Sequence, residues 1–209
     1  MKKQPILFII FLLLISSFVL LSIFVVQYPI PTFDQKVSQF VQNYHSDTLD
    51  KIMLGISFFG ELPWSLLMVL VIAAIFFLFK FKREAYYITS ILSSGLIILG
   101  IKNIIDRPRP TEFYVRLVEI NRFQSFPSGH VLSYVLFFGF MIVLMQSLKT
   151  IPIVTRRIVT VISAFYLLTV AFSRIYLGAH WFTDTIGGIL LGLACLCVLS
   201  HFYLKKKQG

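Results

Sequence analysis

Long apolar runs separated by short polar segments make up most of this chain. A helix that crosses the hydrocarbon part of a bilayer needs about 20 mainly apolar residues, because each residue adds roughly 1.5 Å. The pattern therefore predicts an all-α, polytopic membrane protein with six transmembrane helices. We place the spans at Ile6–Val26, Leu62–Phe79, Ala85–Ile101, Val131–Leu148, Ile158–Phe172 and Thr185–Leu204.

The first and fifth spans depart from the usual length. Ile6–Val26 is longer than the roughly 7–15 apolar residues of a signal peptide, and no A-x-A-like cleavage site follows it. We therefore expect an uncleaved first span. Ile158–Phe172 is short for a transmembrane helix unless its flanking residues snorkel to the interface.

Between the first two spans, Pro29 to Glu61 has mixed polarity. Apolar residues recur there at helical spacing, namely Phe33, Val37, Phe40, Val41 and Tyr44, then Leu49, Ile52, Met53 and Ile56. Such stripes predict short amphipathic helices lying at the membrane surface. The polar segment Asn103–Ser128 is long for a loop in a compact membrane protein, which makes it a candidate lid over a site.

Composition supports the membrane interpretation. The 209 residues are 57% hydrophobic and only 13% charged, whereas soluble domains carry about 25% charged residues. The net charge of +10 does not indicate a nucleic-acid partner, because the chain has no basic, solvent-exposed domain. We find no internal repeat or linker, so we expect residues 1–209 to form one integral-membrane domain.

The distribution of Lys and Arg predicts the orientation. With six spans, both termini share one side with Lys2, Lys3, Lys80, Lys82, Arg83, Lys149, Arg156, Arg157, Lys205, Lys206 and Lys207. The other side has fewer cations outside the candidate site: Lys36, Lys51, Arg107, Arg116 and Arg122. Because cytoplasmic loops carry the excess of Lys and Arg, we expect a plasma-membrane protein with both termini in the cytoplasm.

Three polar islands carry the candidate chemistry. They are Lys102–Pro110 (KNIIDRPRP), Pro127–His130 (PSGH) and Ser173–Asp184 (SRIYLGAHWFTD). In the six-span topology, all three fall on the non-cytoplasmic face. Ionisable residues are costly next to hydrocarbon, so their convergence on one face indicates a functional site there.

The residues of these islands suit a phosphoryl group. Lys102, Arg109 and Arg174 supply three cations, and arginine's planar fork matches phosphate oxygens. Ser128 stands at an N-cap position, and Gly129 lets an oxyanion approach the first N–H groups of the fourth span. No Asp/Glu cluster that would hold Mg²⁺ accompanies them, so we expect neither a metal ion nor a cofactor. Singly, each feature has a simpler explanation, such as a snorkelling side chain or an ordinary helix start.

Together the islands resemble the three signature motifs of the type 2 phosphatidic acid phosphatase (PAP2) superfamily. The matching residues are Lys102, Arg109 and Pro110, then Pro127, Ser128, Gly129 and His130, then Ser173, Arg174, His180 and Asp184. The resemblance implies a PAP2-like helical bundle and a phosphatase. Every motif position is filled in the right order.

The resemblance also implies a role for each position. His180 would be the nucleophile that forms a phosphohistidine, and Asp184 would hold its other ring nitrogen. His130 would protonate the leaving oxygen and then activate water. The phosphoryl oxygens would be held by Lys102, Arg109, Ser128, Gly129 and Arg174, with Ser173, Pro110 and Pro127 in support.

Three function classes follow from these observations. The leading hypothesis is a metal-independent lipid phosphatase that hydrolyses a phosphate or diphosphate monoester at the outer leaflet. Phosphatidylglycerophosphate, phosphatidic acid and undecaprenyl diphosphate are all candidate substrates. The alternatives are a lipid-linked phosphotransferase that uses the same histidine and a non-enzymatic lipid transporter. A transporter would favour ionisable residues near mid-bilayer rather than at one face.

Overall fold

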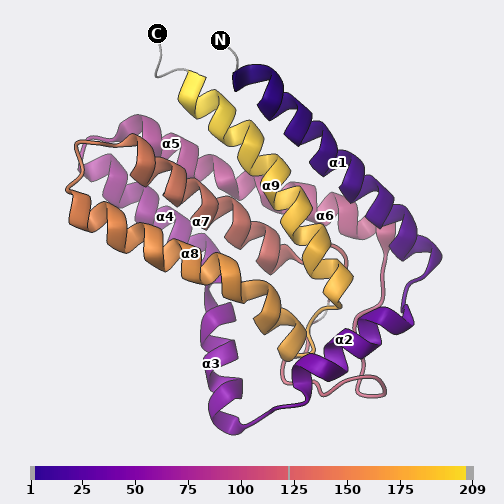
Figure 1. Ribbon diagram of the computed structural model, residues 1–209. Coiled ribbons are helices and arrows are strands. Elements are labelled where there is room, and N and C mark those ends of the chain that lie inside the picture. Colours follow the sequence, from indigo (N-terminus) through magenta and orange to yellow (C-terminus); the bar gives the residue numbers. More distant parts are fainter. Residues whose placement is uncertain (1–2, 122, 206–209) are drawn as a thin grey trace.

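The computed structural model describes residues 3–121 and 123–205, and every regular element within them is a helix (Figure 1). The all-α prediction is therefore confirmed. The helices are α1 (Lys3–Gln27), α2 (Thr32–Gln42), α3 (Asp47–Ser57), η1 (Phe58–Gly60), α4 (Trp64–Leu78), α5 (Lys82–Ser90), η2 (Ile91–Ser93), α6 (Ser94–Ile105), α7 (Gly129–Ser147), α8 (Ile153–Tyr176) and α9 (Phe182–Lys205). Four of the cations that predict the orientation lie outside the described residues: Lys2, Arg122, Lys206 and Lys207.

The described helices fit five or six membrane crossings. Five stretches are long and apolar enough to cross a bilayer: Ile6–Gln27, Lys82–Ile105, Gly129–Ser147, Ile153–Tyr176 and Phe182–Lys205. A sixth crossing is present if Asp47–Gly60 and Trp64–Leu78, which meet at a bend of 59°, form one span. By length and composition, these are the helices of a multi-pass membrane protein.

The second span differs from its predicted form. We placed it at Leu62–Phe79, but α4 has 15 residues and begins only after Pro63. Proline has no backbone N–H to donate within a helix, so it is favoured at a helix start. Pro63 therefore precedes a new helix, α4, and does not continue the helix from α3 and η1. The chain bends by 59° at this point, so the predicted continuous span is replaced by two shorter helical segments.

The fifth span is not short, contrary to the sequence-based bounds. Helix α8 has 24 residues and includes the arginines on both sides of the predicted apolar run. Near its start, Arg156 Nε donates a hydrogen bond to the carbonyl oxygen of Met145 at 2.6 Å. Near its end, the guanidinium of Arg174 bonds the carboxylate of Glu119. Because both cations have partners in the protein, the helix extends past the apolar run.

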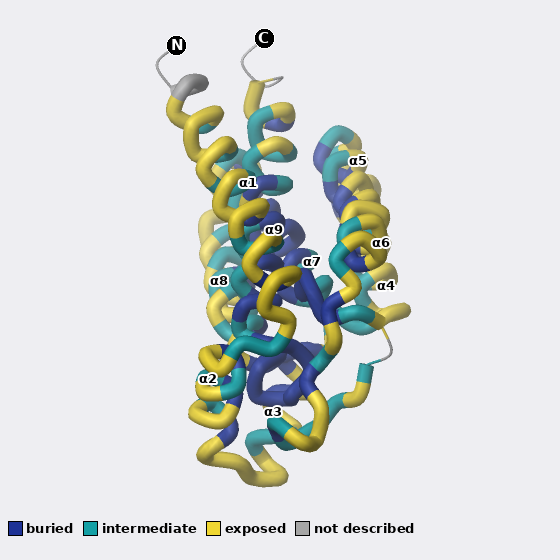
Figure 2. The backbone as a smooth tube through the Cα atoms, turned by 90° about the vertical axis from the view of Figure 1, so that its right-hand side faces the viewer, coloured by how far each residue is buried: buried dark blue, intermediate teal, exposed yellow. Residues whose placement is uncertain are grey.

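Helix α7 forms the centre of the bundle. Twelve of its residues are buried, and α8 and α9 pack against it, while α1 packs on α9 (Figures 1 and 2). The close approach of α9 depends on glycine. A Cβ on Gly188 would lie 2.8 Å from the carbonyl oxygen of Ser128, and one on Gly192 would lie 2.8 Å from Val135 Cβ. Small residues let membrane helices pack this closely.

Helices α2 and α3 confirm the predicted short amphipathic helices. In α2, however, the polar side faces the protein, because Asp34, Ser38 and Gln42 are buried. The apolar side chains of Phe33 and Phe40 are 57% and 81% exposed. A helix turned this way presents apolar groups to its surroundings and polar groups to the segments beneath it. That orientation suits a helix at a membrane surface, which remains a prediction.

The three polar islands lie at one end of the bundle. The start of α1 and the end of α9 lie together at one end, whereas α2, α3 and the loop 106–128 lie at the other (Figure 1). Lys102 is in the last turn of α6, Ser128 directly precedes α7, and the third island joins α8 to α9. The topology thus gathers the islands at the end away from the start of α1.

Candidate active site

His180 lies in the short connection between α8 and α9 and is 1% exposed. Its Nδ1 is 3.4 Å from Oδ2 of Asp184, a residue in the first turn of α9. The backbone N–H of Trp181 donates to the same Oδ2 at 2.9 Å, while the N–H of Asp184 donates to the carbonyl of Trp181. This reciprocal cap fixes the carboxylate beside the imidazole.

The other ring nitrogen faces a cation. Arg109 Nη1 lies 3.3 Å from His180 Nε2 and donates to the carbonyl of Ala179 at 2.6 Å. Burial, together with the positive charges of Arg109, Arg174 and Lys102, lowers the pKa of His180 well below its usual range. The imidazole is therefore neutral near pH 7. With Nδ1–H assigned toward Asp184, Nε2 keeps a lone pair.

Lys102 and Arg109 converge on one part of the loop 106–128. The ammonium of Lys102 donates to the carbonyl of Gln124, and Arg109 donates to the carbonyls of Phe123 and Gln124. Burial and the charge of Arg174 lower the pKa of Arg109 to about 10, so its guanidinium stays positive at neutral pH. Two cations bonded to neutral carbonyls leave positive charge for an anion.

Arg174 is fully buried and already paired. Its Nη1 and Nη2 donate to Glu119 at 2.7 and 2.6 Å, and Nη1 also donates to Ser57 Oγ. Within the described part of the chain, its Nε has no hydrogen-bond partner. A buried unpaired N–H is costly, and at a candidate anion site it is a donor free for a ligand oxygen.

The PSGH island begins α7 and contacts α9. Ser128 caps α7 by accepting from Val131 N at 3.5 Å, and the N–H of Ser128 donates to the carbonyl of Asp184 at 3.0 Å. Gly129 follows as the first residue of the helix. This contact joins the second island to the third.

His130 is held against a different loop. A Cβ on Gly60 would lie 2.2 Å from Cδ2 of the His130 ring, so a side chain at residue 60 would displace the imidazole from this position. Glu61 Oε1 is 3.4 Å from His130 Nε2, and among the described residues this nitrogen has no hydrogen-bond partner. His130 therefore lies next to a carboxylate and keeps a nitrogen without a fixed bond.

One expectation about acidic residues was wrong. We expected no Asp/Glu cluster beside the three islands, yet Glu61 and Glu119 place ligand-type oxygens within 4.8 Å of each other and of a His130 ring nitrogen. Such a group is of a kind that could hold a cation. Both glutamates lie outside the three islands, Glu61 well before the first and Glu119 in the loop between the first two, so motif spacing did not indicate them. Since Glu119 already binds Arg174, we assign the group no metal.

The supporting positions serve packing. Ser173 is buried, and its Oγ donates to the carbonyl of Val170 in the same helix at 3.0 Å. Pro110 and Pro127 are buried as well. Their burial is consistent with the predicted supporting role.

Sequence reasoning missed a buried chain of charges behind His180. Arg107 bridges two carboxylates, donating to Asp184 Oδ1 at 2.5 Å and to Asp34 Oδ2 at 2.6 Å. Ser125 Oγ donates to Asp184 Oδ2 at 2.5 Å. Arg107 lies within the first island but was treated as an ordinary loop cation. For Asp34, the signal was a polar stripe at residues 34, 38 and 42 of a predicted helix.

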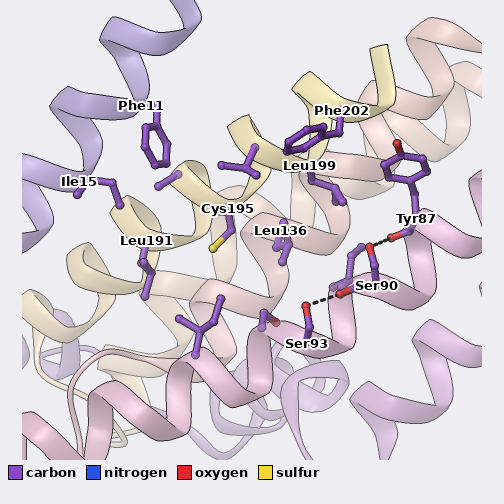
Figure 3. A pocket seen from close by; sticks show the side chains of 15 residues that line it. Phe11, Ile15, Tyr87, Ser90, Ser93, Leu136, Leu191, Cys195, Leu199 and Phe202 are labelled. Carbon is purple, nitrogen blue, oxygen red and sulfur yellow. Dashed lines mark hydrogen bonds between the residues drawn. The ribbon is translucent and has the colours of Figure 1, made fainter. Parts of the chain in front are cut away.

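An apolar groove of about 420 Å³ lies away from this site. Figure 3 shows Phe11, Leu136, Leu191, Cys195 and Phe202 around it, with the hydroxyls of Ser90 and Ser93 at its edge. None of the residues that line the groove is charged. It therefore offers no cation to a phosphate, and the candidate active site remains at the three islands.

Comparison with known families agrees with this geometry. The model of the PAP2 superfamily matches residues 83–208, which contain all three islands. The chain belongs to the PAP2 superfamily. Asp34, Ser57 and Glu61 precede the matched segment, so part of the candidate site is built from outside it.

Individual relatives extend the similarity over most of the chain. Phosphatidylglycerophosphatase B of Bacillus subtilis (strain 168) is 26% identical over 178 residues, covering 84% of this chain and 85% of the relative. The crystal structure of a transmembrane PAP2-type phosphatidylglycerolphosphate phosphatase from Bacillus subtilis matches with a TM-score of 0.81 at 24% identity, over 93% of this chain and 96% of that one. LpxE of Aquifex aeolicus matches with a TM-score of 0.59 at 21% identity, over 81% and 93%. These structures share the fold.

Proposed function

We propose that this PAP2 protein is a metal-independent lipid phosphatase that hydrolyses a phosphate or diphosphate monoester through a phosphohistidine on His180. The observation that carries the proposal is the environment of His180, a buried neutral imidazole with Nδ1 at Asp184 and Nε2 at Arg109. A neutral lone pair beside a cation suits attack on an anionic phosphorus.

The reaction follows from these positions in two steps. Nε2 of His180 forms a bond to phosphorus as the bond to the leaving oxygen breaks, and His130 gives that oxygen a proton. His130 then takes a proton from water, which attacks phosphorus and releases phosphate. Lys102, Arg109 and the free Nε–H of Arg174 neutralise the phosphoryl oxygens throughout.

The substrate class rests on the membrane setting and on the relative. Helices long and apolar enough to cross a bilayer bring the three islands to one end of the bundle, which supports a site within reach of lipid headgroups. Phosphatidylglycerophosphatase B is a similar protein over most of the chain. We therefore expect a lipid phosphate at the outer leaflet, with phosphatidylglycerophosphate, phosphatidic acid and undecaprenyl diphosphate as the compounds to compare.

Phosphate release from detergent-solubilised protein tests this function. The three lipids are supplied separately, with no acceptor other than water, and free phosphate is measured. The wild-type protein and a His45→Ala variant, which alters an exposed histidine outside the site, should release phosphate, and His180→Ala should not. Turnover of the lipid only when an alcohol acceptor is added, with the phosphoryl group recovered on that acceptor and not as free phosphate, would instead indicate a transferase. Equal release by His180→Ala and wild type would exclude the proposed nucleophile.

Chelation tests metal independence separately. We expect turnover to be unchanged in EDTA, because Lys102, Arg109 and Arg174 supply the positive charge that a metal ion would provide. The measurement is phosphate release with EDTA and after added Mg²⁺. Loss in EDTA that Mg²⁺ restores would contradict the proposal, and Glu61, Glu119 and His130 would then be the first residues to examine.

A further inference from the structure

Asp34, Arg107 and Asp184 form a continuous chain of charged side chains, each 0% exposed. Arg107 also donates to the carbonyl of Pro29 at 2.8 Å and to Thr183 Oγ1 at 2.7 Å. The carboxylate of Asp34 accepts from the N–H and the hydroxyl of Thr183 at 2.9 and 2.6 Å. The chain thus connects α2 and the loop 106–128 to the first turn of α9.

The charges of this chain do not cancel. Two carboxylates and one guanidinium leave one net negative charge, and the other partners, Pro29, Thr183 and Ser125, are neutral. Lys102 and Arg109 also attract Asp184, but from a distance, and Arg107 is the cation that forms an ion pair with it. A group in contact with Asp184 that becomes positive is therefore stabilised. His180, whose Nδ1 lies 3.4 Å from Asp184, is such a group.

We propose that Asp34 and Arg107 are positioning residues that fix Asp184 in place while keeping its negative charge available to His180. The inference rests on the proposed function of His180. Arg107 alone would hold Asp184 but would also neutralise it. Because Asp34 balances the charge of Arg107, Arg107 holds Asp184 in place while Asp184 keeps its negative charge.

The benefit appears during phosphoryl transfer. As Nε2 of His180 forms its bond to phosphorus, the imidazole ring gains positive charge, and the electrons of the breaking bond go to the leaving oxygen that His130 protonates. The net charge of the Asp34–Arg107–Asp184 chain then balances the ring. Stabilisation of a charge that develops only in the transition state raises kcat more than it changes KM.

A charge-balance experiment separates this role from simple packing. Asp34→Asn keeps the shape but leaves Arg107 to neutralise Asp184, so we expect kcat to fall about tenfold or more with KM nearly unchanged. Adding Arg107→Gln restores the net charge of minus one, and the two introduced amide side chains are able to bond to each other. We therefore expect the double variant to have a higher kcat than Asp34→Asn alone.

A matched control is available elsewhere in the chain. Asp50 of α3 pairs with Arg116 at 2.5 and 2.9 Å and accepts from the Tyr176 hydroxyl, not from His180 or Asp184. Asp50→Asn should lower the melting temperature and leave kcat unchanged. If Asp50→Asn lowers kcat as much as Asp34→Asn does, the proposed charge effect is wrong.

The outcomes also distinguish this inference from the proposed function. If the double variant is no better than Asp34→Asn while His180→Ala is inactive, only the charge-balance inference fails. If His180→Ala still turns over, the proposed function fails first. Should the double variant not fold, the kcat and KM of Asp34→Asn against those of Asp50→Asn decide the question alone.

Discussion

His180 and His130 each lie beside a carboxylate, but the two pairs are built differently. Asp184 is fully buried and receives hydrogen bonds from Ser125, Trp181 N and Arg107. The carboxylate beside His130 belongs to Glu61, whose side chain is 43% exposed. A fixed partner suits a nucleophile that keeps one orientation, whereas an exposed partner suits a residue that exchanges protons with leaving group and water.

The two histidines should consequently fail in different ways. His180→Ala removes the nucleophile, so no phosphoenzyme forms with any substrate. His130→Ala removes the proton donor, which an aryl phosphate needs less than an alkyl phosphate because its leaving group is a weaker base. Phosphohistidine should still form from the aryl substrate and persist, since the base that activates water is also missing. General acid–base catalysis typically raises a reaction rate about 10²–10⁴-fold, so the difference between the two substrates should be measurable.

Rapid-quench trapping of labelled phosphoenzyme, with alkyl and aryl substrates, measures this difference. Label on His180→Ala would overturn the assignment of the nucleophile. An equally deep defect of His130→Ala with both leaving groups would overturn the assignment of the acid.

Local spacing made the motif residues predictable from sequence, and long-range contacts made their partners unpredictable. The resemblance to the PAP2 motifs implied the contact of His180 with Asp184, and their i, i+4 spacing made it plausible. Asp34 binds Arg107, which lies 73 residues away in the chain. Glu119 binds Arg174, which lies 55 residues away. No local pattern in a single sequence encodes such pairs.

At the level of elements, the position of α9 against α7 decides whether the islands meet. Gly188 lies against Ser128 and Val131, so the first turns of α9 reach the start of α7. The hydrophobic period predicted these two helices correctly, but it marked their ends only approximately. It also identified the stripe of α2 without showing that the polar side would face inward, because periodicity defines a face and not what covers it.

Substitution of Gly188 tests that packing. In Gly188→Ala, the new Cβ meets the carbonyl oxygen of Ser128 at 2.8 Å, a backbone atom that yields only if the helices separate. We expect a stability loss of about 1–3 kcal/mol, as in other overpacked cores, and a fall in phosphate release as Asp184 moves from Ser128. Gly100→Ala in α6 is the control, because its Cβ has no atom within 4 Å. Thermal unfolding of both variants is the measurement, and equal melting temperatures would contradict the packing argument.

For the whole molecule, the end of the bundle that carries the site is clear, but the side of the membrane it faces is a prediction. All three islands lie opposite the start of α1 and the end of α9 (Figure 1). The prediction that this end is outside rests on the excess of Lys and Arg near the termini. An outer-leaflet substrate depends on this orientation.

Single cysteines labelled in intact cells test the orientation directly. Glu112 is exposed in the loop 106–128, which follows the span Lys82–Ile105. Lys82 is exposed at the opposite end of that span, at the start of α5. The two native cysteines, Cys195 and Cys197, lie in α9 and are replaced by alanine first. Glu112→Cys and Tyr114→Cys should react with an impermeant thiol reagent, and Lys82→Cys should react only after the cells are broken. The reverse pattern would place the site in the cytoplasm and exclude an outer-leaflet lipid as its substrate.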